Sequence, residues 1–309
     1  MAHLLVTGSI GIDSVDAPTG SRRDCLGGAA TYFALAAGKL CSVRLVGVVG
    51  DDFPAEFVEI LTSGRIDITG LEIRSGSKTF RWHGRYSQDM NSRVTLDVQL
   101  NVLAEQGPTI PKAFRNSEYV FLANNDPALQ LEFLDQLKRP KLVVCDTMDL
   151  WIEHHRNNLL KVLGRVDGLV INDSEARHLS GKDNLLTAAK CISQLGPRYV
   201  VIKKGEHGVI LYADYADYAD QDVLVLPAYL TETVVDPTGA GDSFAGGLMG
   251  YLTQQEASRD DLAAWRAGLV HATVLASHTV ERFSVDGLVG LDDEKLKCRL
   301  DAYRKMIQP

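Results

Sequence analysis

The sequence predicts a three-layer α/β/α protein whose central sheet is mostly parallel. Short, continuously apolar runs rich in β-branched residues recur along the 309 residues. Such runs are typical of strands that are buried on both faces. Longer helical patterns separate them, and this alternation favours a parallel sheet with helices on both faces. With 45% hydrophobic and 23% charged residues, the chain is long enough to form one large α/β domain with a well-buried core.

The expected strands end in Gly, Asn or Asp and cover residues 3–8, 43–50, 119–124, 141–146, 168–172, 199–205 and 208–214. A further strand is expected at residues 230–235. Helical patterns occupy residues 29–40, 53–64, 127–139, 184–196 and 241–254. The triplet repeat YADYADYAD, residues 212–220, is expected to form a polar hairpin loop between two strands. Ligands of such sheets bind at the carboxyl ends of the strands, so we expect the functional residues there.

Residues 79–100 break this pattern because their apolar side chains alternate with polar ones. Val94, Leu96 and Val98 fall on one face, whereas Thr95 and Asp97 fall on the other. This alternation predicts a half-exposed antiparallel hairpin with its turn near residues 88–91. A strand of this kind does not fit inside the parallel sheet, and we therefore expect the hairpin to form a flap over one edge of the sheet.

Charge and cysteine usage narrow the range of functions. The formal net charge of −8 and the absence of a basic stripe make nucleic-acid or anionic-membrane binding unexpected. The five cysteines have neither metal-ligand nor redox spacing and are expected to be reduced thiols in a cytoplasmic protein. The N-terminus resembles a strand running into a turn and not a signal peptide, and no apolar run reaches the roughly 18 residues that span a bilayer.

The segment VVDPTGAGDSFAGG, residues 234–247, contains four glycines and two aspartates beside an apolar helix. Free backbone amides at a helix start form an anion site, and here Gly239, Ala240 and Gly241 would supply them. Asp242 would stand next to the anion, where a carboxylate is useful as a general base toward an attacking hydroxyl. The alternative is that the glycines serve tight packing and that Asp242 interacts only with the helix dipole.

The stretch DPTGAGDSFAGG closely resembles the C-terminal signature of the ribokinase-like (PfkB) carbohydrate kinase family. Other segments resemble family motifs in the same order along the chain: GSIGIDSV, GGAATYFALAAGKL, VGVVGDDFPAEF, INDSEARHLSG and KKGEHGV. The resemblance covers essentially the whole chain. It implies one ribokinase-like domain, residues 1–309, in which residues 79–100 with part of 12–24 form a β lid over the acceptor site.

The resemblance also implies ATP-dependent phosphorylation of a hydroxyl, with Asp242 as the base and residues 239–242 as the anion hole. The acceptor would contact Asp13, Gly27, Gly28 and Tyr32, and the nucleotide Asn172, Lys203, Gly205, Gly208 and Thr238. Glu175 would organise Mg²⁺ through water, because Mg²⁺ gives up its water shell reluctantly. Asp236 and Ser284 would match positions that hold a monovalent cation such as K⁺. On its own, the Asn-x-x-Glu pattern indicates only a helix N-cap.

Three departures from the family pattern concern the substrates. Tyr32 stands where many sugar kinases of the family have Asn, Ala29 where they often have Lys, and Lys203 where the nucleotide loop usually opens with Thr. The first two argue against ribose itself. An aromatic side chain near the acceptor can stack on a base, which makes a nucleoside a credible acceptor besides a sugar.

The sequence also bears on three alternative functions: an inactive sensor, a dinucleotide-binding oxidoreductase and a P-loop enzyme. An inactive relative that only senses a sugar or nucleoside would usually have lost the base or the anion hole, and this chain keeps both. A dinucleotide-binding oxidoreductase or a P-loop enzyme would need glycine motifs that are absent. The aromatic and basic side chains of the lid, Trp82, His83, Arg85 and Tyr86, would either close over the acceptor and exclude water or form the contact of a homodimer.

Overall fold

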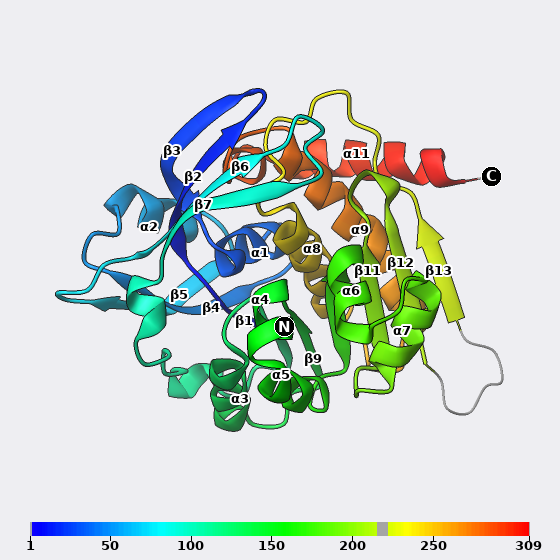
Figure 1. Ribbon diagram of the computed structural model, residues 1–309, viewed down its shortest axis with the longest axis horizontal. Coiled ribbons are helices and arrows are strands. Elements are labelled where there is room, and N and C mark those ends of the chain that lie inside the picture. Colours follow the sequence, from blue (N-terminus) through cyan, green and yellow to red (C-terminus); the bar gives the residue numbers. More distant parts are fainter. Residues whose placement is uncertain (1, 215–221, 309) are drawn as a thin grey trace.

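The computed structural model describes residues 2–214 and 222–308, which form two sheets (Figure 1). The large sheet has nine strands in the order β13-β12-β11-β10-β9-β8-β1-β4-β5. Their bounds are β1 Leu4–Thr7, β4 Val43–Gly50, β5 Ile66–Arg74, β8 Tyr119–Leu122, β9 Leu142–Asp146, β10 Gly168–Asn172, β11 Tyr199–Lys203, β12 Val209–Ala213 and β13 Asp222–Leu226. Neighbouring strands are parallel except at β12, which is antiparallel to β11 and β13. The predicted mostly parallel sheet is confirmed.

Helices cover both faces of this sheet, as the continuously apolar strands predicted. Their bounds are α1 Ala29–Ala37, α2 Ala55–Thr62, α3 Pro127–Gln136, α4 Asp149–His154, α5 Arg156–Leu163, α6 Asp173–Ser180, α7 Leu185–Ser193, α8 Ala240–Gln254, α9 Leu262–Val280, α10 Asp286–Val289 and α11 Asp293–Ile307. Leu4 and Val6 of β1 belong to the hydrophobic core beneath α1, α8 and α9, whereas Leu5 between them belongs to the core beneath α3, α5 and α7. Within the described ranges, no helix combines the length and the apolar composition needed to cross a bilayer.

Most long helices begin at a side chain that satisfies their first free amides. Asp126, Asn184, Asp261 and Asp292 accept hydrogen bonds from the first turns of α3, α7, α9 and α11. Helix α8 differs, because Gly239 is its N-cap and no side chain caps it. The first amides of α8 therefore have no side-chain acceptor among the described residues.

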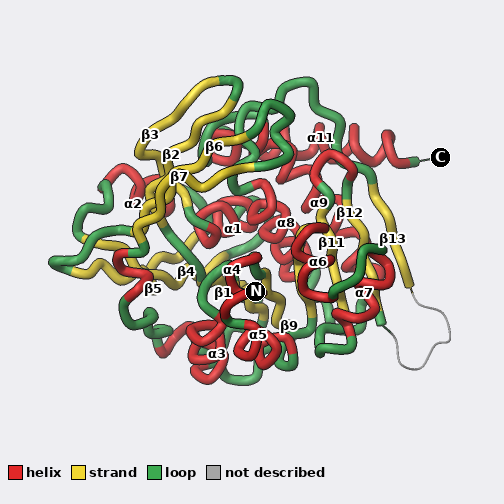
Figure 2. The backbone as a smooth tube through the Cα atoms, in the orientation of Figure 1, coloured by secondary structure: helices red, strands yellow, loops and turns green. Residues whose placement is uncertain are grey.

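A separate four-stranded sheet has the order β3-β2-β6-β7, and we call it the small sheet. Its strands are β2 Gly11–Ala17, β3 Gly20–Gly27, β6 Phe80–Tyr86 and β7 Arg93–Gln99. Strands β6 and β7 are antiparallel, which confirms a hairpin at residues 79–100. The expectation that the hairpin is half-exposed is wrong for β7, because all of its residues are exposed. Figure 2 shows the small sheet standing beside α1 and α2, with the β6–β7 hairpin reaching toward α8.

The prediction of a strand at residues 230–235 is wrong. This segment has no regular structure and packs against the end of α9, where the amides of Val235 and Asp236 both donate to the carbonyl of Val280, at 2.7 and 3.2 Å. Of the predicted loop at residues 212–220, Tyr212 and Ala213 belong to β12, and residues 215–220 lie outside the described part of the chain.

Candidate active site

The glycine-rich segment turns sharply into α8. Gly239 has a φ of 75°, and a Cβ at this position would lie 2.3 Å from the ring of Tyr32, so only glycine fits. The amide of Ala240 donates to Pro237 O at 3.1 Å. The amides of Gly239 and Gly241 find no acceptor among the described residues, which leaves these two for an anion.

Asp242 lies in the first turn of α8, as the sequence predicted, and is partly exposed. Burial of its carboxyl group raises its pKa, while the charges of Lys203 and Arg93 act in the opposite direction. Lys203 ends β11, and its Nζ would lie 2.7 Å from a Cβ at Gly241, so its ammonium group is next to the turn that opens α8. The site thus combines a carboxylate, free amides and cations.

Two further carboxyl groups face the same region. Glu175 is 8% exposed. Burial raises the pKa of its carboxyl group, and the positive charge of Lys203 acts in the opposite direction. Asp146 ends β9, is 6% exposed, and its Oδ1 has no hydrogen-bond partner in the described ranges. Burial and then the charge of Asp242 raise the pKa of Asp146 well above its usual range. Asp146 was not among the site residues predicted from the sequence, although its position at the carboxyl end of a predicted strand was a usable signal.

Asn172 and Glu175 form a capping box at the start of α6. The Asn172 side chain accepts from the Glu175 amide at 2.8 Å, and Glu175 Oε2 accepts from the Asn172 amide at 3.0 Å. The helix-cap interpretation is thus correct, and it places one Glu175 oxygen in a structural role. In residues 2–214 and 222–308, no cluster of three or more His, Cys, Asp or Glu side chains is arranged to hold a metal ion.

Asp13 lies on β2 against the start of α1. Its Oδ2 would be 1.9 Å from a Cβ at Gly27, and Gly28 has a φ of 95°, so both glycines are required by close packing. Asp13 is 4% exposed, and its Oδ1 has no partner among the described groups. Burial raises its pKa to about 7, a backbone hydrogen bond from Gly28 lowers it, and the charges of Asp236 and Asp242 raise it further. An unpaired carboxyl oxygen in this position is suited to accept a hydrogen bond from a ligand hydroxyl.

Tyr32 lies on α1 with its ring against Gly239, and only 1% of its surface is exposed. Its phenolic oxygen is buried and has no hydrogen-bond partner in the described part of the chain. Burial, followed by the charges of Asp13 and Asp236, raises its pKa well above the usual range. The ring therefore packs behind the turn that opens α8, and its hydroxyl is available as a hydrogen-bonding group.

Asp236 and Ser284 are neighbours, as the resemblance implied. The Asp236 carboxylate accepts from the amides of Thr238, at 2.9 Å, and of Ser284, at 3.1 Å. Asp236 is 1% exposed, and burial raises its pKa. Ser284 has a φ of 53° and donates its hydroxyl to Leu26 O at 2.6 Å. This pair joins the anion-binding turn to the loop after α9.

The predicted nucleotide loop connects β11 to β12. Gly205 and Gly208 have φ values of 55° and 84°, and a Cβ at Gly208 would lie 2.0 Å from Leu226 O. Glu206, between them, accepts a hydrogen bond from Asn91 Nδ2 at 3.0 Å. The tip of the β6–β7 hairpin thus contacts this loop.

The small sheet has an inner face that looks toward the site and an outer face. Tyr86 is on the inner face, because its hydroxyl accepts a hydrogen bond from Thr238 Oγ1 at 3.1 Å. Arg93, the register partner of Tyr86, is near enough for its charge to lower the pKa values of Asp242 and Glu175. Arg93 was not among the residues predicted from the sequence, since only the folded hairpin brings it to α8.

His83 and Arg85 lie on the outer face. His83 Nε2 and Arg85 Nη2 lie 3.1 and 3.5 Å from Asp16 Oδ2. Arg23 Nη2 lies 2.6 Å from the other carboxylate oxygen, Asp16 Oδ1. Hydrogen bonds from Arg23, Ser21 and His83 hold the pKa of Asp16 well below its usual range. Of the four lid side chains named from the sequence, Trp82 and Tyr86 therefore face the site, and His83 and Arg85 face away from it.

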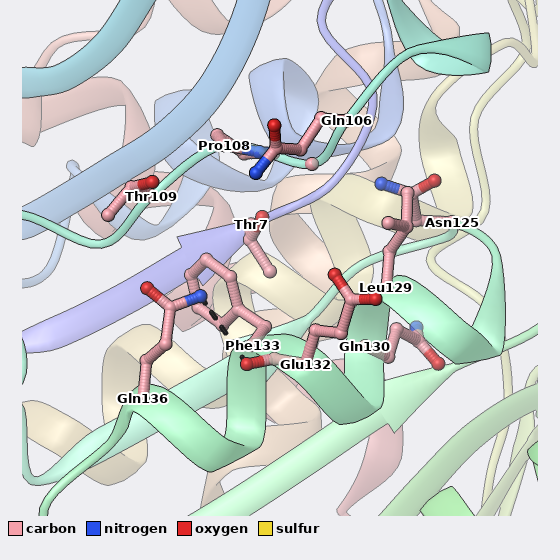
Figure 3. A pocket seen from close by; sticks show the side chains of 11 residues that line it. Thr7, Gln106, Pro108, Thr109, Asn125, Leu129, Gln130, Glu132, Phe133 and Gln136 are labelled. Atoms are coloured by element: carbon pink, nitrogen blue, oxygen red, sulfur yellow. Dashed lines mark hydrogen bonds between the residues drawn. The ribbon is translucent and has the colours of Figure 1, made fainter.

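A cavity of about 100 Å³ lies between α3 and residues 106–109, on the opposite face of the large sheet from α8 (Figure 3). Amide and hydroxyl groups, together with Leu129 and Phe133, make up most of its lining. None of the predicted site residues lines it. We therefore place the candidate active site at the start of α8 and not in this cavity.

Comparison with known proteins matches residues 5–283 to the model of the pfkB family of carbohydrate kinases. The chain is 34% identical over 260 residues to a cytidine kinase of Thermococcus kodakarensis, covering 81% of this chain and 89% of the relative. It is 30% identical over 232 residues to a nucleoside kinase of Methanothermobacter thermautotrophicus, covering 74% and 71% of the two chains.

The fold is similar to the crystal structure of a nucleoside kinase of Methanocaldococcus jannaschii, described as an archaeal member of the ribokinase family. The TM-score is 0.75 at 21% sequence identity, and the match covers 98% of this chain and 99% of the other. This likeness shows the fold.

Proposed function

The chain belongs to the pfkB family of carbohydrate kinases, and we propose that it transfers the γ-phosphoryl group of ATP to a hydroxyl of an unphosphorylated nucleoside or sugar. The observation that carries the proposal is the start of α8. There Asp242 stands beside the amides of Gly239 and Gly241, which have no acceptor in the described part of the chain, and within range of two cations. A base, an anion hole and positive charge are the parts that phosphoryl transfer needs.

In this reaction Asp242 accepts the proton of the attacking hydroxyl. Burial raises its pKa, which makes it a better base than an ordinary aspartate, and the positive charges of Lys203 and Arg93 favour its ionised form. The amides of Gly239 and Gly241 hold the negative charge that develops on the transferring group. Tyr32 supports the turn that presents these amides.

Lys203 and Arg93 neutralise the phosphoryl oxygens from two sides. Lys203 is part of the large sheet, whereas Arg93 comes from the small sheet. Arg93 is held over the site by the contacts Tyr86–Thr238 and Asn91–Glu206. We propose that the small sheet is a lid and that its closure delivers the second cation together with the exclusion of water.

The carboxylates fit a divalent cation that accompanies ATP. Mg²⁺ prefers oxygen ligands and commonly binds proteins through one or two carboxylates plus phosphates and water. Asp146, with its unpaired buried Oδ1, and Glu175 would hold Mg²⁺ in this way. When bound, Mg²⁺ neutralises charge on the phosphates. Asn172, Thr238 and the loop with Gly205 and Gly208 would contact the rest of the nucleotide.

The acceptor binds between Asp13 and Asp242. Asp13 Oδ1 accepts hydrogen bonds from two neighbouring hydroxyls, with Gly27 and Gly28 allowing close approach. Asp13, Asp236 and Asp242 make this region negative, while Arg23, His83 and Arg85 are engaged with Asp16 on the outer face. A phosphate group on the acceptor would be repelled there, so an unphosphorylated acceptor is favoured.

Among unphosphorylated acceptors we propose a nucleoside, supported by the cytidine kinase and the nucleoside kinase with which the chain shares 30% identity or more. Asp236 and Ser284 would place a monovalent cation such as K⁺ beside the anion hole and so adjust its charge.

An ADP-release assay with Mg-ATP tests this function. The panel contains pentoses and hexoses, their phosphates, and pyrimidine and purine nucleosides, each with K⁺ and with Na⁺. We expect turnover on nucleosides, none on sugar phosphates, and a higher rate in K⁺. Turnover on a sugar phosphate would contradict the acceptor class. Binding of ATP and a nucleoside without turnover would instead indicate an inactive sensor of the same fold.

A further inference from the structure

Trp82 has a definite place in the acceptor site because of the register of the small sheet. Strands β2 and β6 pair in parallel without interruption from Gly11↔Phe80 to Asp16↔Arg85, and Trp82 is the partner of Asp13. Paired residues project from the same face of a sheet, so the indole lies on the face of Asp13. Tyr86, four residues further along β6, confirms that this face looks toward the loop of Thr238.

The indole is held in one orientation. Its Nε1 donates to Thr95 Oγ1 at 3.2 Å, and its six-membered ring lies over Gly84. A Cβ at Gly84 would be 2.1 Å from this ring, so the glycine provides the space in which the indole lies flat along the strand. Trp82 is half-buried and not part of either hydrophobic core. A fixed, partly exposed indole beside a hydroxyl-binding carboxylate has the properties of a binding surface.

Arg93 connects Trp82 to the reaction centre. Its guanidinium group stands 5.9 Å from the indole centroid, at the outer limit of a cation–π contact, while its charge acts on Asp242. Trp82, Asp13 and Asp242 therefore surround one region. A ligand that extends from Asp242 past Asp13 meets the indole with its distal end.

We infer that Trp82 is the platform on which the acceptor's aromatic base stacks, and that it makes the site selective for nucleosides over free pentoses. This inference rests on the proposed function and goes further, because it names the residue that reads the base. A free pentose can satisfy Asp13 but has no aromatic ring for Trp82. Base–aromatic stacking is tolerant of base identity, so Trp82 selects the class of acceptor and not one particular base.

The first test uses steady-state kinetics of Trp82→Leu with a nucleoside and with D-ribose. Stacking energies predict a loss in kcat/KM for the nucleoside of about 5- to 150-fold, mostly through KM, and little change for ribose. Trp82→Phe retains an aromatic ring and should keep most of the nucleoside activity. Gly84→Ala is an independent variant, because its methyl group displaces the indole without removing it. Equal losses on nucleoside and ribose, or no loss on the nucleoside, would overturn the platform while leaving the kinase function intact.

Tryptophan fluorescence supplies a readout that does not depend on turnover. The chain has three tryptophans: Trp265 is fully buried against Tyr199, and Trp151 donates to Asn124. In a Trp151→Phe background, a nucleoside should quench emission and ribose should not, and Trp82→Leu should abolish the quenching. Quenching through Trp82 without phosphoryl transfer would support the platform and sink the proposed kinase function. Absence of quenching during active turnover would overturn the platform alone, and absence of both signals would overturn both proposals.

Discussion

The hydroxyl of Thr238, in the turn that opens α8, donates a hydrogen bond of 3.1 Å to the hydroxyl of Tyr86 on the small sheet. This bond joins the anion-binding turn to the proposed lid. Tyr86 is 9% exposed, so the contact is shielded from water. The small sheet and the turn that opens α8 are thus coupled through one pair of side chains.

Removing either hydroxyl should weaken lid closure to the same extent. Tyr86→Phe and Thr238→Val are each expected to lower kcat/KM for the acceptor by about 2- to 10-fold, the range of one hydrogen bond. The double variant should lose no more than either single variant, because both remove the same bond. Steady-state kinetics of the three variants measure this coupling, and fully additive losses would show that the two hydroxyls act independently.

Substitution of Gly239 should cost both stability and activity. Gly239→Ala combines a left-handed φ with a Cβ 2.3 Å from the Tyr32 ring. Gly76→Ala is the matched control, because Gly76 has a φ of 78° and no atom lies within 4 Å of its Cβ position. Both substitutions introduce backbone strain that lowers the free energy of unfolding by roughly 1–2 kcal/mol. Gly239→Ala adds an overpacking cost of about 1–3 kcal/mol.

Urea unfolding measures the free energy of both variants, and the kinase assay their activity. We expect Gly76→Ala to retain activity and Gly239→Ala to lose it. An active Gly239→Ala protein with the stability of the control would contradict the close approach of Tyr32 to the turn.

Arg93 should contribute to the transition state, whereas Arg85 on the same hairpin should not. Arg93→Gln removes a cation that acts on Asp242 and is expected to lower kcat by on the order of 10²-fold. Arg85→Gln, whose side chain is 63% exposed and pairs with Asp16, should keep a near-wild-type kcat. Steady-state kinetics at saturating ATP make the comparison. Similar kcat values for the two variants would show that Arg93 has no specific role in the transition state.

The buried carboxyl group of Asp13 should make the protein less stable at alkaline pH. Its pKa is about 7 in the folded protein, against 3.8 when unfolded, so the folded state binds the proton more tightly. The stabilising contribution of this proton is complete below pH 3.8 and is lost as the pH rises through 7. Asp13→Asn stays neutral and should gain up to about 3 kcal/mol relative to wild type between pH 5 and pH 8, while losing acceptor binding.

Unfolding in urea at the two pH values, without substrates, measures this effect. A free-energy difference between Asp13→Asn and wild type that does not change with pH would refute it. The gain is the reverse of the usual effect of a substitution at a buried site, and it is the result expected if this carboxylate is kept for binding at a cost in stability.

The parallel strands and the turn that opens α8 could be predicted because each depends on residues that are close together in the sequence. Continuous apolar runs identified the parallel strands, and the glycines of residues 239–241 identified the turn at which α8 begins. The error at residues 230–235 has a tertiary cause. Val234 and Val235 have β propensity, yet their backbone meets the end of α9, where Val280 O accepts the amides of Val235 and Asp236.

The site residues that were missed depend on contacts between distant segments. Arg93 is exposed on a hairpin, and only the docking of Tyr86 on Thr238 brings it near Asp242. Asp146 ends a strand like several other polar residues, and it becomes notable only because β9 and β10 place it beside Glu175. Sequence spacing carries no information on such pairs, since they are separated by tens of residues.

The proposed role of Asp242 as the catalytic base is tested by the kcat of Asp242→Asn with Mg-ATP and the best nucleoside acceptor. Calorimetry of ATP binding serves as the control for folding and nucleotide affinity. We predict that kcat falls by about 10²- to 10⁴-fold while ATP still binds. An Asp242→Asn protein that binds ATP and turns over at close to the wild-type rate would contradict the mechanism.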